Sequence, residues 1–134
     1  MPGVDKVLTA REETEMANGI RPPVWQMVRQ AIDALRGRAT TGELKDWIER
    51  AFPGTNAGTV QNQIGFCTVN NPARVHEEVN REAREANGQY DFLFQVARGE
   101  YERFDSRRHG RWCIREVSPM RFQVEQLEAP RGQG

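Results

Sequence analysis

The sequence predicts an α+β domain with a three-helix helix-turn-helix core, an additional charged helix and a small antiparallel β-meander. Two observations predict this fold class. Apolar residues recur at helical spacing in three consecutive segments before residue 68, and each segment follows a helix-start signal. From residue 90 onward, aromatic and β-branched residues are enriched, as is typical of strands. We expect residues 1–20 to form a flexible arm, 21–128 to form the domain and 129–134 to form a disordered tail.

The first helix is expected to begin at Arg21-Pro22-Pro23, because proline is tolerated in the first turn of a helix. We expect it to end at Gly37. Four apolar residues lie at helical spacing between these limits, namely Trp25, Val28, Ile32 and Leu35.

Capping signals predict the next two helices. The segment Thr40-Thr41-Gly42-Glu43 is a capping-box pattern, which predicts a helix from about Thr41 to Ala51. A third helix follows a cap provided by Thr55 or Asn56. The residues expected on its buried face are Val60, Ile64 and Cys67. Three short helices in this order predict a helix-turn-helix core.

The chain after the third helix predicts a fourth helix of different character. Asn70-Asn71-Pro72 ends the third helix, and residues 72–86 are rich in charge. The expected apolar stripe of this fourth helix is narrow and consists of Val75, Val79 and Ala83. Asn87-Gly88 is expected to end it.

Three short strands are predicted after the fourth helix. Residues 90–96, 101–104 and 111–115 combine aromatic and β-branched side chains, and we expect them to pair as an antiparallel meander. The polar residues 105–110 are expected to form the loop between the second and third strands. Residues 117–127 are compatible with either a strand or a short helix.

Composition and charge exclude several classes of protein. The chain has 19 basic and 19 acidic residues, so its zero net charge argues against a broadly basic nucleic-acid-binding surface. No apolar run reaches the roughly 20 residues of a membrane span. The first residues show no secretory signal pattern, so we expect a cytoplasmic protein. Cys67 and Cys113 lack metal-ligand spacing, and we expect them to be reduced.

The outward face of the third helix is a candidate surface for reading DNA. Its residues on the side opposite Val60 and Ile64 are uncharged, small or amide-bearing. Amide side chains match adenine in the major groove, and threonine contacts methyl groups there. The alternative is an ordinary solvated helix face. The candidate base contacts are Thr59, Gln61, Asn62 and Gln63.

Two further groups of residues are candidate phosphate contacts. The predicted loop before the third strand, with the residue that follows it, supplies Arg107, Arg108, His109 and Arg111, which favours a wing that grips the DNA backbone. The alternative is a solvated hairpin with salt bridges at its rim. The junction of the third and fourth helices supplies Asn70, Asn71 and Arg74, placed to hold a phosphate at a helix N-terminus. Simple capping by the asparagines is the alternative there.

No pattern in the sequence predicts catalysis. His76 and His109 are the only histidines, and neither has the partner spacing of a zinc site. No nucleophile elbow, Walker loop or glycine-rich dinucleotide motif follows a predicted strand. The acidic residues Glu100, Glu102 and Asp105 lack the clustering with lysine or histidine that a nuclease needs. We therefore expect no independent enzyme activity, no metal and no cofactor.

Several segments in order resemble one family. They are RPPVWQMVRQAIDAL, ATTGELKDWIERAFPGTNAGTVQNQI, TVNNPARVH and YDFLFQVARGEYERFDSRRHGRW. They resemble bacterial winged-helix domains, akin to HARE-type helix-turn-helix domains, that are found alone or beside restriction-type nucleases. The resemblance covers about residues 22–116. It implies a winged-helix fold and a link to defence and modified-DNA recognition, because some stand-alone members are similar to readers of 5-methylcytosine. Cleavage is not carried over, because the chain shows no counterpart of the nuclease.

We therefore expect a winged-helix protein that binds double-stranded DNA, is associated with the nucleoid and is a candidate reader of 5-methylcytosine. The expected partner is duplex DNA, methylated or unmethylated, and the sequence leaves a homodimer open. The alternative is a protein-interaction module with the same fold and no direct DNA binding, which the zero net charge favours. A hydrolase or nuclease fragment that acts with a partner chain is a third hypothesis.

Overall fold

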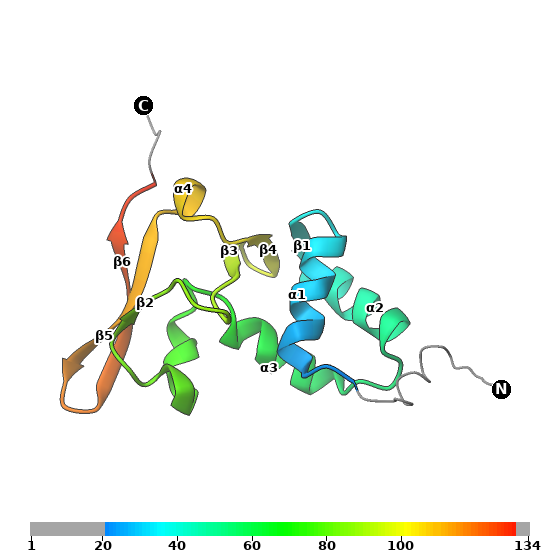
Figure 1. The fold of residues 1–134 in the computed structure, drawn as a ribbon, viewed down its shortest axis with the longest axis horizontal. Helices are drawn as coiled ribbons and strands as arrows, with labels where there is room; N and C mark the ends of the chain where they lie inside the picture. The colour runs from blue at the N-terminus through cyan, green and yellow to red at the C-terminus, as the bar shows by residue number, and fades with distance from the viewer. Residues whose placement is uncertain (1–20, 131–134) are drawn as a thin grey trace.

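The computed structural model describes residues 21–130, which form a mixed α+β structure (Figure 1). The α-helices in this range are α1 (Val24–Ala34), α2 (Thr41–Ala51), α3 (Ala57–Phe66) and α4 (Ser106–His109). Two short 3-10 helices are η1 (Pro72–His76) and η2 (Glu78–Asn80). The strands are β1 (Arg38–Thr40), β2 (Arg84–Glu85), β3 (Leu93–Ala97), β4 (Glu100–Arg103), β5 (Arg111–Ser118) and β6 (Arg121–Glu128).

The first sheet has the strand order β1-β4-β3, and both pairings are antiparallel. β4 is the central strand, so Tyr101 lies opposite Ala39 on one side and opposite Gln95 on the other. Residues 67–70 cover the outer edge of β3. The backbone N–H of Val69 donates to the carbonyl of Leu93 at 2.8 Å, and the N–H of Leu93 donates to the carbonyl of Cys67 at 3.0 Å. The chain thus closes this edge immediately after α3.

The main hydrophobic core lies between the first sheet and helices α1, α2 and α3. The apolar residues at helical spacing face one another there because burying one face of each helix removes apolar area from water. Trp25 packs at the margin of this core against Tyr90, with 4.9 Å between ring centroids. The fully buried aliphatic residues of the core are Val28, Ile32, Leu44, Ile48, Val60, Ile64 and Leu93.

The three predicted core helices are confirmed, with one boundary shifted. α2 spans Thr41–Ala51 as expected, and Thr40 and Glu43 form both hydrogen bonds of the capping box. Asn56 is the cap of α3. α1 ends at Ala34, before the expected end at Gly37, because the chain turns there to enter β1. The turn requires the left-handed backbone conformation of Gly37, whose φ is 83°.

The predicted fourth helix over residues 72–86 is wrong. The chain forms η1, η2 and the two-residue strand β2 in its place. The residues buried in η1 and η2 are the polar Arg74 and Asn80, whereas Val79 of the expected apolar stripe is 52% exposed. Buried polar contacts therefore determine the conformation of residues 72–86. The positions of the buried polar residues do not match the spacing of the apolar residues that predicted a helix.

The predicted three-stranded meander is also wrong in its pairing. β3 and β4 form a hairpin as expected, but β5 leaves that sheet and pairs with β2 on one side and β6 on the other. The short helix α4 separates β4 from β5, and its N-terminus is capped by the side chain of Asp105. The segment left open in the sequence, residues 117–127, completes β5 and forms most of β6.

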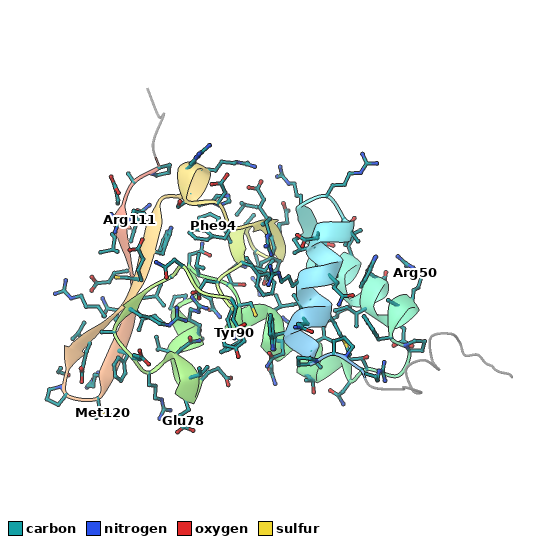
Figure 2. The ribbon with its side chains drawn as sticks, in the orientation of Figure 1. Arg50, Glu78, Tyr90, Phe94, Arg111 and Met120 are labelled. Carbon is teal, nitrogen blue, oxygen red and sulfur yellow. The ribbon has the colours of Figure 1, made fainter. Side chains whose placement is uncertain are left out.

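An aromatic cluster joins the two sheets. The ring of Phe94 in β3 stacks on His109 with 4.1 Å between centroids and contacts Trp112 of β5 edge-on at 5.8 Å. The indole N–H of Trp112 donates to the carbonyl of His109 at 2.8 Å. Phe94 accordingly lies between the helices and the β5–β6 hairpin (Figure 2). This cluster connects the part built on α1, α2 and α3 to the second sheet.

The expected flexible arm, residues 1–20, lies outside the described residues, as do residues 131–134 of the expected tail. Among the helices that the structure describes, none has the length and apolar character needed to cross a bilayer.

Candidate nucleic-acid interface

The N-terminus of α3 is built by local polar contacts. The side-chain oxygen of Asn56 accepts from the backbone N–H of Thr59 at 2.9 Å, which satisfies one of the free amides of the first turn. The preceding turn is held by Thr55, whose hydroxyl donates to the carbonyl of Phe52 at 2.7 Å. These contacts fix the start of α3 directly after Asn56.

The two sides of α3 differ sharply in chemistry. Val60, Ile64 and Phe66 are buried, because they pack into the core. Thr59, Gln61 and Asn62 are exposed, and Gln63 is half-buried. The four base-contact candidates predicted from the sequence thus lie on α3, with three of them fully accessible and no charged residue in the helix.

Arg21 lies beside the N-terminus of α3, which the sequence analysis did not predict. Its guanidinium Nη2 donates to the carbonyl of Pro53 at 3.0 Å and to the hydroxyl of Thr55 at 2.9 Å. In the sequence, the segment Arg21-Pro22-Pro23 indicates only the start of the first helix. Its proximity to α3 arises from contacts that span more than 30 positions along the chain, so no local pattern indicates it.

The asparagines predicted to contact phosphate have structural partners. The Asn70 side chain donates to the carbonyl of Gln95 and accepts from the N–H of the same residue, each at 2.9 Å, so it extends the pairing at the edge of β3. Asn71 donates to the carbonyl of Gly65 at 2.9 Å and accepts from the N–H of Ala73, which caps η1. The capping alternative therefore describes Asn71, and neither side chain is fully exposed.

Arg74 is not placed to contact DNA, because its side chain is completely buried. Its guanidinium donates to Asp91 at 2.6 Å and to the carbonyl of Phe66 at 3.0 Å. Arg84 also donates to Asp91, at 2.6 Å, and to Asn80 at 2.7 Å. A phosphate has no access to this arginine, so the predicted role of Arg74 is wrong.

The buried ion pair changes the titration of its members. Burial lowers the pKa of Arg74, and the negative charge of Asp91 opposes that effect. Burial acts to raise the pKa of Asp91, but the hydrogen bond from Arg84 and the charge of Arg74 outweigh it and hold this pKa below its usual range. The network therefore keeps an ionised carboxylate inside the protein.

The predicted arginine loop is only partly accessible. His109 is buried, and its Nε2 lies 2.9 Å from a carboxylate oxygen of Glu102. Its Nδ1 accepts from the backbone N–H of Asp105 at 3.1 Å. Arg108 is exposed but pairs with Glu102 at 3.0 Å. Arg107 is exposed on the same short helix. The loop therefore closes on Glu102 and does not extend as a wing.

Glu102 is the centre of this closure. Burial acts to raise its pKa, but the hydrogen bond from His109 and the charge of Arg108 outweigh burial and lower it. Arg38 of β1 adds a third cationic contact at 3.3 Å. The carboxylate thus ties β1, β4 and α4 together.

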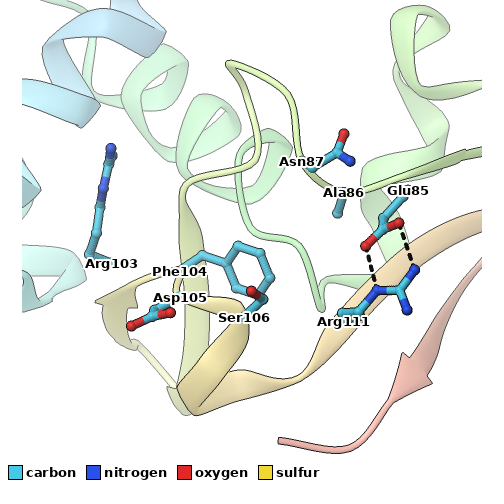
Figure 3. Close-up of a pocket in the computed structure, with 8 residues that line it drawn as sticks. All are labelled: Glu85, Ala86, Asn87, Arg103, Phe104, Asp105, Ser106 and Arg111. Carbon is cyan, nitrogen blue, oxygen red and sulfur yellow. Dashed lines mark hydrogen bonds and ion pairs between the residues drawn. The ribbon is translucent and has the colours of Figure 1, made fainter. Parts of the chain in front are cut away.

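Arg111 lies on the wall of a cavity of about 510 Å³ between β2 and the β4–α4 connection (Figure 3). Its guanidinium makes two hydrogen bonds with Glu85, at 2.8 and 2.9 Å, and one with Glu128 at 3.1 Å. The contacts with Glu85 are the main reason that its pKa is raised. The positive charge of Arg111 is therefore already neutralised within the protein, and the wall it belongs to offers little attraction for phosphate.

Residues 21–130 contain no group of three or more histidine, cysteine or acidic side chains close enough to hold a metal ion. Cys67 and Cys113 are free thiols and buried.

Comparison with known proteins gives one match. A family model described as "Domain of unknown function (DUF7669)" matches residues 23–103. The chain belongs to the DUF7669 family. The DUF7669 match runs from the start of α1 to the end of β4, so it covers the core helices and the whole first sheet. No curated protein and no solved structure gives a significant match.

Proposed function

We propose that the DUF7669 part of this protein is a winged helix that binds duplex DNA. The observation that carries the proposal is the chain order of the three core helices and the strands of the first sheet, α1-β1-α2-α3-β3-β4, with η1, η2 and β2 inserted between α3 and β3. It is combined with the strand order β1-β4-β3 and with the exposure of Thr59, Gln61 and Asn62 on α3. In helix-turn-helix proteins the second helix of the motif enters the major groove. Here α2 and α3 are that motif, and the β3–β4 turn is a short wing.

The proposed base contacts lie on α3. Gln61 and Asn62 each present an amide, which both donates and accepts hydrogen bonds and so suits the exposed edge of adenine. Gly58 and Thr59 keep the first turn slim, so the backbone is able to approach a base closely. A small surface of this kind also suits the methyl group of thymine or of 5-methylcytosine, which supports a candidate role as a reader of modified DNA.

The proposed phosphate contacts differ from the arginine loop expected from the sequence. Arg21 is fixed beside the first turn of α3, where free backbone N–H groups also attract an anion. Arg98 is exposed in the β3–β4 turn. Few cations take part, so we expect a shallow dependence of affinity on salt, with a slope that corresponds to a small number of phosphates. With this function we propose a location in the cytoplasm, on the nucleoid, and we propose no catalytic step.

A fluorescence-anisotropy titration tests this proposal. A CpG-containing duplex, unmethylated or fully methylated, is titrated at low and at moderate salt with the wild-type chain and with Gln61→Ala/Asn62→Ala. We expect the double variant to bind about thirtyfold more weakly or worse, because two amide pairs with bases are lost and each is worth roughly 1–3 kcal/mol. The matched control is Gln26→Ala/Gln30→Ala, which removes two exposed amides from α1 and leaves affinity unchanged.

Each outcome of the titration decides a separate point. Tighter binding of the methylated duplex supports modification reading, whereas equal binding leaves a general DNA-binding domain. Equal losses in both double variants contradict the placement of α3 in the groove. No binding to either duplex at low salt contradicts DNA binding altogether and favours the protein-interaction module.

A protein-interaction module is the second candidate, and exposed apolar residues favour it. Val117, Met120 and Leu127 on the β5–β6 hairpin are 46%, 72% and 51% exposed. Val117 and Met120 lie together at the turn of the hairpin, whereas Leu127 lies at its base. Single exposed apolar residues are common, so only the pair at the turn favours a surface for protein contact.

A further inference from the structure

The β5–β6 hairpin leaves one strand edge unpaired. β6 is the last strand of the second sheet, and β5 is its only strand partner within residues 21–130. η1 packs against β6, but no backbone hydrogen bond joins the two in the described part of the chain, so the outward backbone N–H and C=O groups of β6 have no strand partner there. The turn of the hairpin carries Met120 away from the helices (Figure 2). An open strand edge is a template for another strand.

Two copies of β6 that pair antiparallel would place complementary side chains opposite each other. When two copies of β6 run antiparallel and are centred on Gln123, Arg121 of one lies opposite Glu125 of the other. Phe122 then lies opposite Val124, and Gln123 opposite Gln123. The second half of the pairing repeats these contacts by symmetry, so each dimer contains two ionic and two apolar cross-strand pairs.

The charges also select this register over its neighbours. A two-fold axis perpendicular to the sheet keeps each side chain on its own face, so the centre must fall on a residue. Centring on Glu125 places two carboxylates opposite each other, which is unfavourable. Centring on Phe122 places Glu125 opposite Pro119, and centring on Val124 places Arg121 opposite the apolar Leu127. Centring on Gln123 places Arg121 opposite Glu125, which also contacts Arg115 of its own chain at 3.4 Å, and pairs Phe122 with an apolar residue.

We propose that a second copy of this chain pairs along β6, with Gln123 at the two-fold axis, to make a continuous sheet in the order β2-β5-β6-β6-β5-β2. The strand is eight residues long, and the favourable pairs span Arg121 to Glu125. An interface of this size is small, so the association depends on protein concentration. The pairing does not involve α3, so it is independent of DNA binding.

Sedimentation equilibrium with charge-reversal variants tests the pairing. We expect Arg121→Glu to weaken dimerisation by about tenfold, because it replaces two attractive cross-strand pairs with two repulsive ones. Glu125→Arg is expected to weaken dimerisation in the same way, but it also removes the contact between Glu125 and Arg115 within the chain. The double variant Arg121→Glu/Glu125→Arg restores the pairs in reversed polarity, so we expect its affinity to return towards the wild-type value. The matched control is Arg29→Glu on the exposed side of α1, with no change expected.

Cross-linking locates the axis without changing charge. In this register the two copies of position 123 lie directly opposite each other, so Gln123→Cys is expected to give a covalent dimer with a short bis-maleimide. Gln30→Cys on α1 is expected to stay monomeric under the same conditions. A chain that stays monomeric at all concentrations overturns the proposal. So does a dimer that is indifferent to charge reversal and does not cross-link through position 123.

Discussion

The most constrained residues of the protein are the polar ones of the Arg74–Asp91 network. Arg74, Asp91 and Asn80 are each at most 6% exposed, although two of them carry charge. Burying charges is costly unless they are paired and hydrogen-bonded. Arg84 joins the network through Asp91 and Asn80, and the network anchors η1, η2 and β2 to the start of β3. Within residues 21–130, Nη1 of Arg74 is buried without a hydrogen-bond partner, so the pairing of this guanidinium is incomplete.

Replacing the buried carboxylate is expected to be strongly destabilising. Asp91→Asn leaves the buried charge of Arg74 without its partner, so we expect the free energy of unfolding to fall by about 3–5 kcal/mol. Urea denaturation followed by circular dichroism measures this. Asp46→Asn, an exposed substitution on α2, is the matched control and is expected to have little effect. If Asp91→Asn lowers the free energy of unfolding no more than Asp46→Asn does, the Arg74–Asp91 pair does not stabilise the fold.

The same carboxylate predicts how stability depends on pH. The pKa of Asp91 is lower in the folded protein than in the unfolded chain, so its stabilisation is complete above the unfolded value of about 3.9. That stabilisation is lost as pH falls from there through the folded pKa. We expect the wild-type chain to lose stability in this acidic range more steeply than Asp91→Asn, as measured by urea denaturation between pH 5 and pH 2. Parallel curves would contradict the prediction.

The thiol of Cys67 is predicted to be inert in the folded state. Burial raises its pKa to about 12, and the charge of Arg74 only partly opposes this. The thiolate is the reactive form, and the side chain is fully buried. In a Cys113→Ser background, we expect iodoacetamide at pH 8 to modify Cys67 only on unfolding, as followed by mass spectrometry. Modification at the rate of an unfolded control would contradict it.

At the scale of elements, local sequence signals decide where the helices form, whereas long-range contacts decide where the short strands form. The capping box of Thr40 and Glu43 predicts where α2 begins, because its hydrogen bonds lie within four positions along the chain. The three residues of β1 are too few to show a strand period, and their pairing partner in β4 lies about 60 positions away. Short strands are therefore decided by what they pair with.

The base of the β5–β6 hairpin depends on a glycine. Gly110 has a φ of 84°, and a β-carbon there would lie 2.4 Å from the carbonyl oxygen of Glu128. Gly110→Ala is therefore expected to destabilise the fold by roughly 1–3 kcal/mol, since both the backbone conformation and the close approach are lost. Gly42→Ala, where the nearest atom is 3.9 Å away, is the control. Thermal denaturation of the two variants makes the comparison, and equal melting temperatures would contradict it.

At the scale of the whole molecule, the two sheets act as one unit through the cluster of Phe94, His109 and Trp112. The DUF7669 match ends at residue 103, but Glu102 within it is closed over by α4 outside it. The second sheet is therefore part of the folded unit.

Removing the indole at this junction is predicted to weaken both parts together. Trp112→Ala deletes a half-buried ring and its hydrogen bond to His109, so we expect a loss of about 2–4 kcal/mol in a single cooperative transition. Trp112→Phe keeps the ring contact and is expected to lose less. Calorimetry that shows two separate transitions in the wild-type chain would contradict the joint unfolding.

The sequence by itself determined the three core helices, the capping box of α2, the buried faces of the helices and the exposure of Thr59, Gln61 and Asn62 on α3, because helical periodicity and capping act over a few residues. The sequence did not determine β1, the second sheet, or which charged residues are buried and paired. The residues next to Arg74 and His109 in the sequence do not indicate that these two side chains are buried. They are buried beside Asp91 and Glu102, which lie 17 and seven positions away along the chain and contact them in the folded structure. Only the tertiary structure decided which arginines are already paired and which face solvent.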